Sequence, residues 1–147
     1  MTTRKERSIQ ENILSWQVLR LFCKFTTPPK NKHLLLVSIY PQPLLFMVNS
    51  HIHPYIKIRP HLMSCQVSLK ANKHFFLAHD SYVDCREACA HFSLNDIVKQ
   101  VSNDRGRLKG FISEEAQEQV IAAIKVCPVL EKKYKNLILD ELVALEV

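Results

Sequence analysis

Two apolar segments, residues 33–40 (HLLLVSIY) and residues 44–50 (LLFMVNS), decide the expected fold. Both are rich in Leu, Val and Ile, and only residues 41–43 (PQP) separate them. Branched apolar residues favour strands, so the two segments predict a strand pair joined by a short turn. Apolar and polar alternation predicts a further strand at residues 65–69 (CQVSL), and residues 75–78 and 81–85 are expected to form another strand pair.

The C-terminal half carries helix signals. Ser93 and Asp96 have capping-box spacing ahead of a short apolar-faced helix. Ser113 is the expected N-cap of a second helix, because two Glu residues follow it in the first turn. A third helix is expected over residues 130–145, and its apolar residues (Leu137, Ile138, Leu142 and Leu145) predict self-association.

The N-terminal residues read differently. Ser8 and Glu11 also have capping-box spacing, and apolar residues follow at helical intervals, which predicts a helix over residues 9–24. Residues 26–31 (TTPPKN) then predict a linker, because proline removes backbone donors. Residues 51–61 carry two prolines and three histidines and predict an irregular loop.

These elements together predict an α+β fold, in which a small antiparallel sheet or barrel is closed off by C-terminal helices. We expect two parts: residues 1–30 as an N-terminal extension with a helix and a Pro linker, and residues 31–147 as the barrel domain with its helices.

Composition excludes several classes of protein. Gly106 and Gly110 are the only glycines, so the sequence contains neither a phosphate-binding P-loop nor a dinucleotide-binding glycine motif. No apolar run approaches the ~18 residues of a membrane span, and five scattered cysteines fit reduced thiols. We therefore expect a cytoplasmic protein without a membrane partner.

Charge is unevenly distributed along the chain. Residues 1–74 hold eleven Lys or Arg against two Glu, whereas residues 75–147 hold nine against twelve acidic residues. This split favours a basic surface that binds a polyanion, although an ordinary solvated surface gives the same counts.

Three segments carry a family resemblance: residues 80–85 (DSYVDC), residues 107–113 (RLKGFIS) with the following helix, and residues 32–50. In this order they resemble the PemK/MazF-like toxin family of bacterial toxin-antitoxin systems. The resemblance implies a small SH3-like barrel, a homodimer, that cleaves single-stranded RNA without a metal or other cofactor and is neutralised by an antitoxin protein. Lys32 stands where the family has Arg, and residues 28–31 (PPKN) replace its glycine-rich loop.

Candidate site residues follow from this resemblance and from RNA chemistry. Lys32 and Ser50 occupy the positions that the family uses for catalysis, and His51 is the expected proton carrier, with His33 and His53 as alternatives. The expected RNA-binding residues are Lys30, Lys57 and Arg59. A non-catalytic barrel module that binds a protein partner through its helices is the alternative.

Two other groups of residues suggest chemistry. Cys85, Cys89 and His91 could hold zinc, but buried thiols are the expected state, and we predict no metal site. His79 and Asp80 resemble part of a hydrolase triad, but neighbours on a strand point to opposite faces, so Asp80 is expected to cap a turn.

Overall fold

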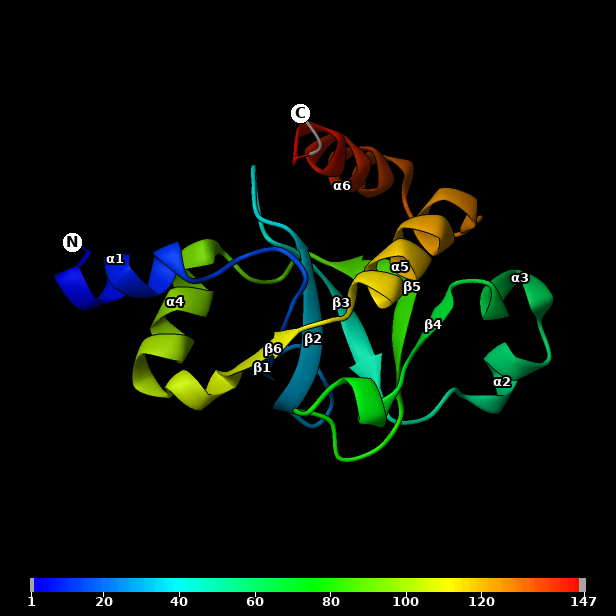
Figure 1. Cartoon of the computed structure of the whole chain (residues 1–147), viewed down its shortest axis with the longest axis horizontal. Coiled ribbons are helices and arrows are strands. Elements are labelled where there is room, and N and C mark those ends of the chain that lie inside the picture. Colours follow the sequence, from blue (N-terminus) through cyan, green and yellow to red (C-terminus); the bar gives the residue numbers. More distant parts are fainter. Residues whose placement is uncertain (1, 146–147) are drawn as a thin grey trace.

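The computed structural model describes residues 2–145 and shows a mixed α+β fold (Figure 1). Six antiparallel strands form one curled sheet in the order β4-β5-β3-β2-β1-β6. The strands are β1 (Gln17–Cys23), β2 (Lys30–Ser38), β3 (Leu44–Asn49), β4 (Gln66–Leu69), β5 (Ser81–Cys89) and β6 (Leu108–Phe111). The expected antiparallel sheet with C-terminal helices is confirmed, and its curl is compatible with a barrel-like sheet.

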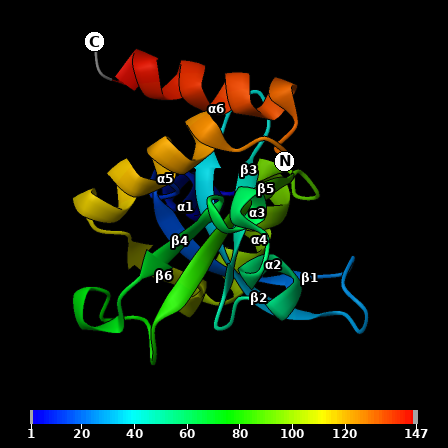
Figure 2. The same cartoon turned by 90° about the vertical axis from the view of Figure 1, so that its right-hand side faces the viewer.

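Helices cover both faces of this sheet. They are α1 (Arg4–Glu11), α2 (Pro54–Lys57), α3 (Pro60–Met63), α4 (Leu94–Asn103), α5 (Glu114–Val126) and α6 (Lys132–Leu145), with short 3-10 turns at η1 (Ala71–Lys73) and η2 (Arg105–Arg107). α1 and α4 pack on one face and α5 and α6 on the other (Figures 1 and 2). Among the described residues, no helix combines the length and apolar character that crossing a membrane requires.

The centre of the sheet explains why β2 is so apolar. Leu34 and Leu36 are fully buried in the cluster that includes α1 and α4, while Leu35 and Val37 are fully buried in the cluster that includes α5 and α6. A strand covered on both faces needs a continuous apolar run rather than an alternating one. The expected strand over residues 33–40 is confirmed for this reason, and so is its partner β3.

The helix expected over residues 9–24 is wrong. α1 begins four residues earlier than Ser8, with Thr3 as its N-cap, and ends at Glu11. Trp16 then has a positive φ of 74°, and the chain turns into β1. β1 pairs with β2 and β6, so the apolar residues expected on a helix face are buried by a strand instead. The expected domain boundary at residue 30 therefore lies within the β1–β2 hairpin.

Two further expectations are corrected. Residues 51–61 contain the short helices α2 and α3 rather than an irregular loop, because Pro54 and Pro60 stand at the start of each helix, where proline is favoured. Residues 75–78 form no strand; they lie in the turn that leads to β5. The N-caps expected at Ser93 and Ser113 are confirmed.

The last helix packs within the chain. Ile138 of α6 is fully buried, and Leu142 is nearly so, both in the cluster shared with the sheet. These side chains are therefore not surplus apolar surface, and self-association stays a prediction without their support. The Leu145 side chain lies outside the described residues.

Candidate functional site

A polar groove of about 670 Å³ lies at one end of the sheet. β2 begins at this end, β3 finishes there, and β5 begins there, because each runs antiparallel to its neighbour. Residues of the turn before β5 and of the segment between β3 and α2 also line the groove. Its chemistry comes mainly from Lys32, His33, Ser50, His51, Asp84 and Arg86.

Three residues expected at the site meet in this groove. Lys32, Ser50 and His51 all line it, although 18 positions of chain separate the first from the second. The antiparallel β2–β3 hairpin brings them together, since His33 is opposite Val48. The Nζ of Lys32 donates to Oδ1 of Asn49 at 3.4 Å. This acceptor is neutral, so it leaves the lysine charge available to an anion.

Asp84 and Arg86 form the most strongly bonded pair in the groove. Asp84 accepts from Nε and Nη2 of Arg86, at 2.9 and 2.8 Å, and from Nε2 of Gln66 at 2.9 Å. These bonds, and then the carboxylate charge, raise the pKa of Arg86 above its ordinary value. The pair holds the guanidinium in a fixed orientation at the groove wall.

Neither residue of this pair was among the expected site residues. The sequence signal was the alternation of Asp84 and Arg86 with two apolar residues. The structure buries these two, Val83 and Cys85, fully. Alternation on a strand sends Asp84 and Arg86 to the opposite face. What the alternation could not reveal is that this face borders the groove.

The pKa of His33, which lines the groove, lies below its ordinary value. Burial lowers its pKa below the ordinary value of 6.5, and the charges of Lys109, Arg20 and Lys32 lower it further. Its imidazole is therefore neutral near pH 7 and able to accept a proton. His53 has a structural role, because its Nδ1 accepts from the backbone N–H of Tyr55 and so caps α2.

Consecutive residues of β2 contribute to the lining of the groove. Lys32 and His33 are consecutive residues of β2 and point to opposite faces, yet both line the same cavity.

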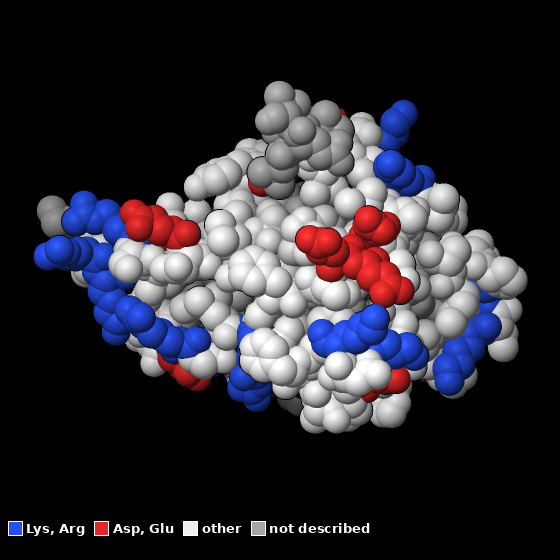
Figure 3. Space-filling model, viewed as in Figure 1, with Lys and Arg blue, Asp and Glu red and all other residues white. Residues whose placement is uncertain are grey.

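The three expected RNA-binding residues do not line this groove. Lys30 is exposed at the start of β2, and Lys57 is exposed at the end of α2. The guanidinium of Arg59 lies over the Tyr55 ring at 3.5 Å and donates to its carbonyl oxygen at 2.7 Å. Their contact with RNA stays a prediction. Basic side chains also gather over α1, and acidic ones over α5, so charge is spread over several surfaces (Figure 3).

The suspected zinc ligands are separated. Cys85 is buried in the cluster that includes α5 and α6, whereas Cys89 belongs to the opposite cluster, because a register shift lies between them in the β3–β5 pairing. The His91 ring stacks on Phe25. The buried-thiol interpretation of Cys85 is confirmed. Asp80 has a structural role, since its Oδ1 accepts from the backbone N–H of Ala71, the first residue of η1, at 2.8 Å.

Comparisons with known proteins add no assignment. No protein-family model matches the chain, and no curated protein matches it. The groove itself is lined by a cation, a hydroxyl, a neutral imidazole and further histidines, and these side chains indicate its chemistry.

Proposed function

We propose that the polar groove binds single-stranded RNA and cleaves it without a metal. The observation that supports this proposal is that Lys32, His33, Ser50 and His51 all line one groove, and that the lowered pKa of His33 keeps its imidazole neutral. Cleavage of this kind needs a cation for the phosphate, a base for the 2′-hydroxyl and an acid for the leaving oxygen.

The reaction divides these roles among the groove residues. His33 removes the proton of the 2′-hydroxyl, and the 2′-oxygen attacks phosphorus as the bond to the 5′-oxygen breaks. His51 gives a proton to that 5′-oxygen, so the products are a 2′,3′-cyclic phosphate and a 5′-hydroxyl. An in-line displacement needs base and acid on opposite sides of phosphorus, so in this proposal His33 and His51 flank the scissile phosphate.

Lys32 and Ser50 act on the phosphate itself. The ammonium of Lys32 offsets the charge that builds on the phosphate oxygens, and the hydroxyl of Ser50 donates a hydrogen bond that orients them. Arg86, fixed by Asp84, lines the same groove and binds a neighbouring phosphate.

The sequence resemblance supplies the wider role. We propose a toxin-like protein with an SH3-like barrel, which forms a homodimer in the cytoplasm of a bacterium and is neutralised by an antitoxin protein. Phe75 is 90% exposed, and Phe111 is 51% exposed on the edge strand β6. Exposed aromatic residues beside an open sheet edge support association with another chain.

A leaving-group experiment tests the acid and base assignments. His33→Ala and His51→Ala should each slow cleavage of single-stranded RNA in chelator by about 10²- to 10⁴-fold. In a substrate with sulfur in place of the bridging 5′-oxygen, the sulfur leaves as a thiolate and needs no proton from an acid. This substrate should restore the cleavage rate of His51→Ala but not that of His33→Ala.

Binding is measured separately from cleavage. Ser50→Ala should abolish cleavage with little loss of affinity, while Lys32→Ala should shallow the salt dependence of binding by less than one unit of slope. Lys125→Ala is the matched control, because Lys125 is an exposed lysine of α5 outside the groove. RNA binding without cleavage would overturn the catalytic role alone, whereas no binding at low salt would contradict both RNA roles and favour the module that binds a protein partner.

A further inference from the structure

A second pocket, of about 440 Å³, lies beside the hairpin that joins β1 to β2. Phe22, Phe25, His91 and Lys99 are among the residues that line it, and they come from the hairpin, from the segment after β5 and from α4. No role proposed above involves it. We call it the Phe25 pocket.

The pocket presents a rigid aromatic surface. The Phe25 ring stacks on the His91 ring at a centroid distance of 4.1 Å and an interplanar angle of 16°. It also meets the Phe92 ring edge to face at 5.9 Å. Phe25 and Phe22 remain 39% and 37% exposed, so ring surface is held in place and still open to a ligand.

The charges around the rings favour an anion. Lys24, Lys99 and Arg107 line the pocket together with Asp96 and Asp104. Both carboxylates already accept backbone hydrogen bonds: Asp96 from the N–H of Ser93, and Asp104 from the N–H of Gly106. Three cations against two carboxylates leave the lining of the pocket with a net charge of +1.

The Phe25 pocket adjoins the polar groove. Arg107 lines the pocket and Asn31 lines the groove. Nη1 of Arg107 donates to Oδ1 of Asn31 at 2.8 Å, so one hydrogen bond connects the two walls. A single strand lying in the groove can continue past this contact.

We propose that the Phe25 pocket holds an unpaired base of the single-stranded RNA whose backbone occupies the polar groove. The base stacks on the Phe25 ring, and Lys24 and Lys99 contact the flanking phosphates. Every base has a flat π face, so this subsite adds affinity without selecting one base. The inference rests on the proposed function, since it needs the strand in the groove.

Abasic substitution tests this inference. Fluorescence anisotropy measures the affinity of the full chain for a labelled single-stranded RNA, with one abasic position moved along it. In the unmodified protein, one position should weaken binding by about five- to 150-fold, the range of a lost base–aromatic stack. In Phe25→Ala, intact RNA should bind that much more weakly, and the same abasic position should have no further effect.

Controls separate folding from stacking. Phe25→Leu keeps apolar packing but removes the ring face, so it should behave like Phe25→Ala even if the alanine variant folds poorly. Tyr40→Ala removes a 65%-exposed aromatic ring outside both cavities and should bind as the unmodified protein does. Phe25 variants that bind intact RNA normally would overturn this inference alone. Absence of RNA binding by the unmodified protein at low salt would overturn the proposed function as well.

Discussion

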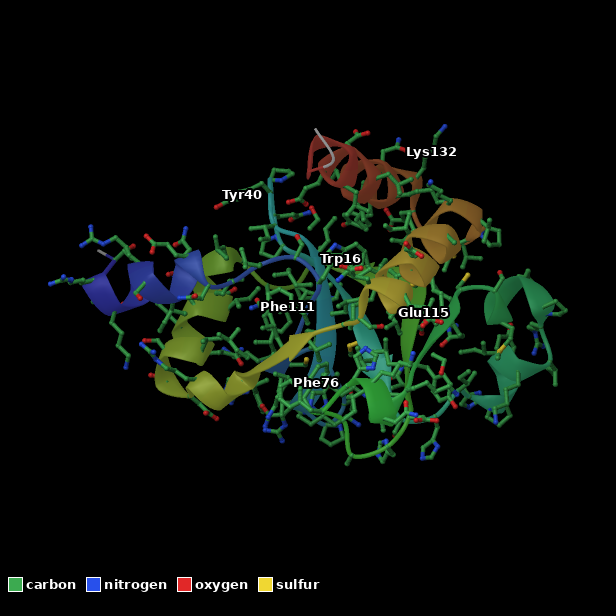
Figure 4. All side chains as sticks on the ribbon, viewed as in Figure 1. Trp16, Tyr40, Phe76, Phe111, Glu115 and Lys132 are labelled. Carbon is green, nitrogen blue, oxygen red and sulfur yellow. The ribbon has the colours of Figure 1, made fainter. Side chains whose placement is uncertain are left out.

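Gly110 lies directly against the ring of Phe76. A Cβ at residue 110 would be 2.8 Å from Cδ1 and 2.9 Å from Cε1 of that ring, and the φ of Gly110 is +155°. Figure 4 shows Phe76 below β6, the strand that contains Gly110. Phe76 also lines the polar groove, so this close approach fixes the turn that forms one groove wall.

Gly110→Ala should therefore destabilise the protein by about 1–3 kcal/mol, because the new methyl group overlaps the ring and the backbone conformation disfavours a side chain. Urea unfolding followed by circular dichroism measures the change. Gly106→Ala is the matched control and should cost less, since its Cβ would meet only the side chain of Asp104, at 3.1 Å. Equal losses at the two glycines would contradict this account of Gly110.

His74 should stabilise the folded protein by bonding the backbone at the start of α5. It is 3% exposed; its Nδ1 bonds the carbonyl oxygen of Lys70 at 2.8 Å, and its Nε2 accepts from the N–H of Ser113 at 3.1 Å. His74→Leu leaves both backbone groups without this partner and should lower the free energy of unfolding by about 1–3 kcal/mol. His61→Leu, at an exposed position, should change it little.

His33 should make stability fall as the solution becomes acidic. Burial holds its pKa in the folded protein below 6.5, so the unfolded chain binds more protons as the pH drops through 6.5. The contribution of neutral His33 to the free energy of unfolding is fully present above pH 6.5 and is lost as the pH falls through the pKa of the folded state. His33→Gln should reduce the decline of the urea midpoint between pH 7 and pH 5. An unchanged decline would mean that His33 titrates like an exposed histidine.

The cysteines should resist alkylation in the native state. Burial raises the pKa of Cys65 to about 12, with Cys127 adding to the effect, and raises that of Cys89 to about 11. At pH 8 the thiolate fraction of Cys65 is then about one in ten thousand, and only the thiolate reacts. Mass spectrometry after iodoacetamide should show little labelling of the native protein, and labelling of all five thiols in guanidinium chloride. Rapid native labelling of Cys65 would contradict its burial.

Local sequence determined the central hairpin and the helix caps. Residues 33–40 and 44–50 are short, rich in branched apolar residues and separated by two prolines, which favours a strand pair, and the structure has one in β2 and β3. Ser93 and Ser113 cap their helices through hydrogen bonds to residues three positions later. Such signals act over a few residues and need no knowledge of the rest of the fold.

Elsewhere the same local pattern allowed two structures. Residues 17–23 fit a helical and an alternating period, and pairing with β2 and β6 selected the strand, because sheet hydrogen bonds and burial outweigh a modest local preference. Pro54 and Pro60 predicted a loop yet begin short helices, since proline suits the first turn of a helix as well as a break.

The sequence by itself therefore determined the α+β class, the central strands and the buried thiols, and the roles of Lys32, Ser50 and His51 stay predictions made from it. Only the tertiary structure decided that these three share a groove with Asp84 and Arg86, and that Arg107 joins this groove to the Phe25 pocket. The physical reason is distance along the chain. Strand order and register bring these segments together, and no local pattern records which distant backbone a strand will pair with.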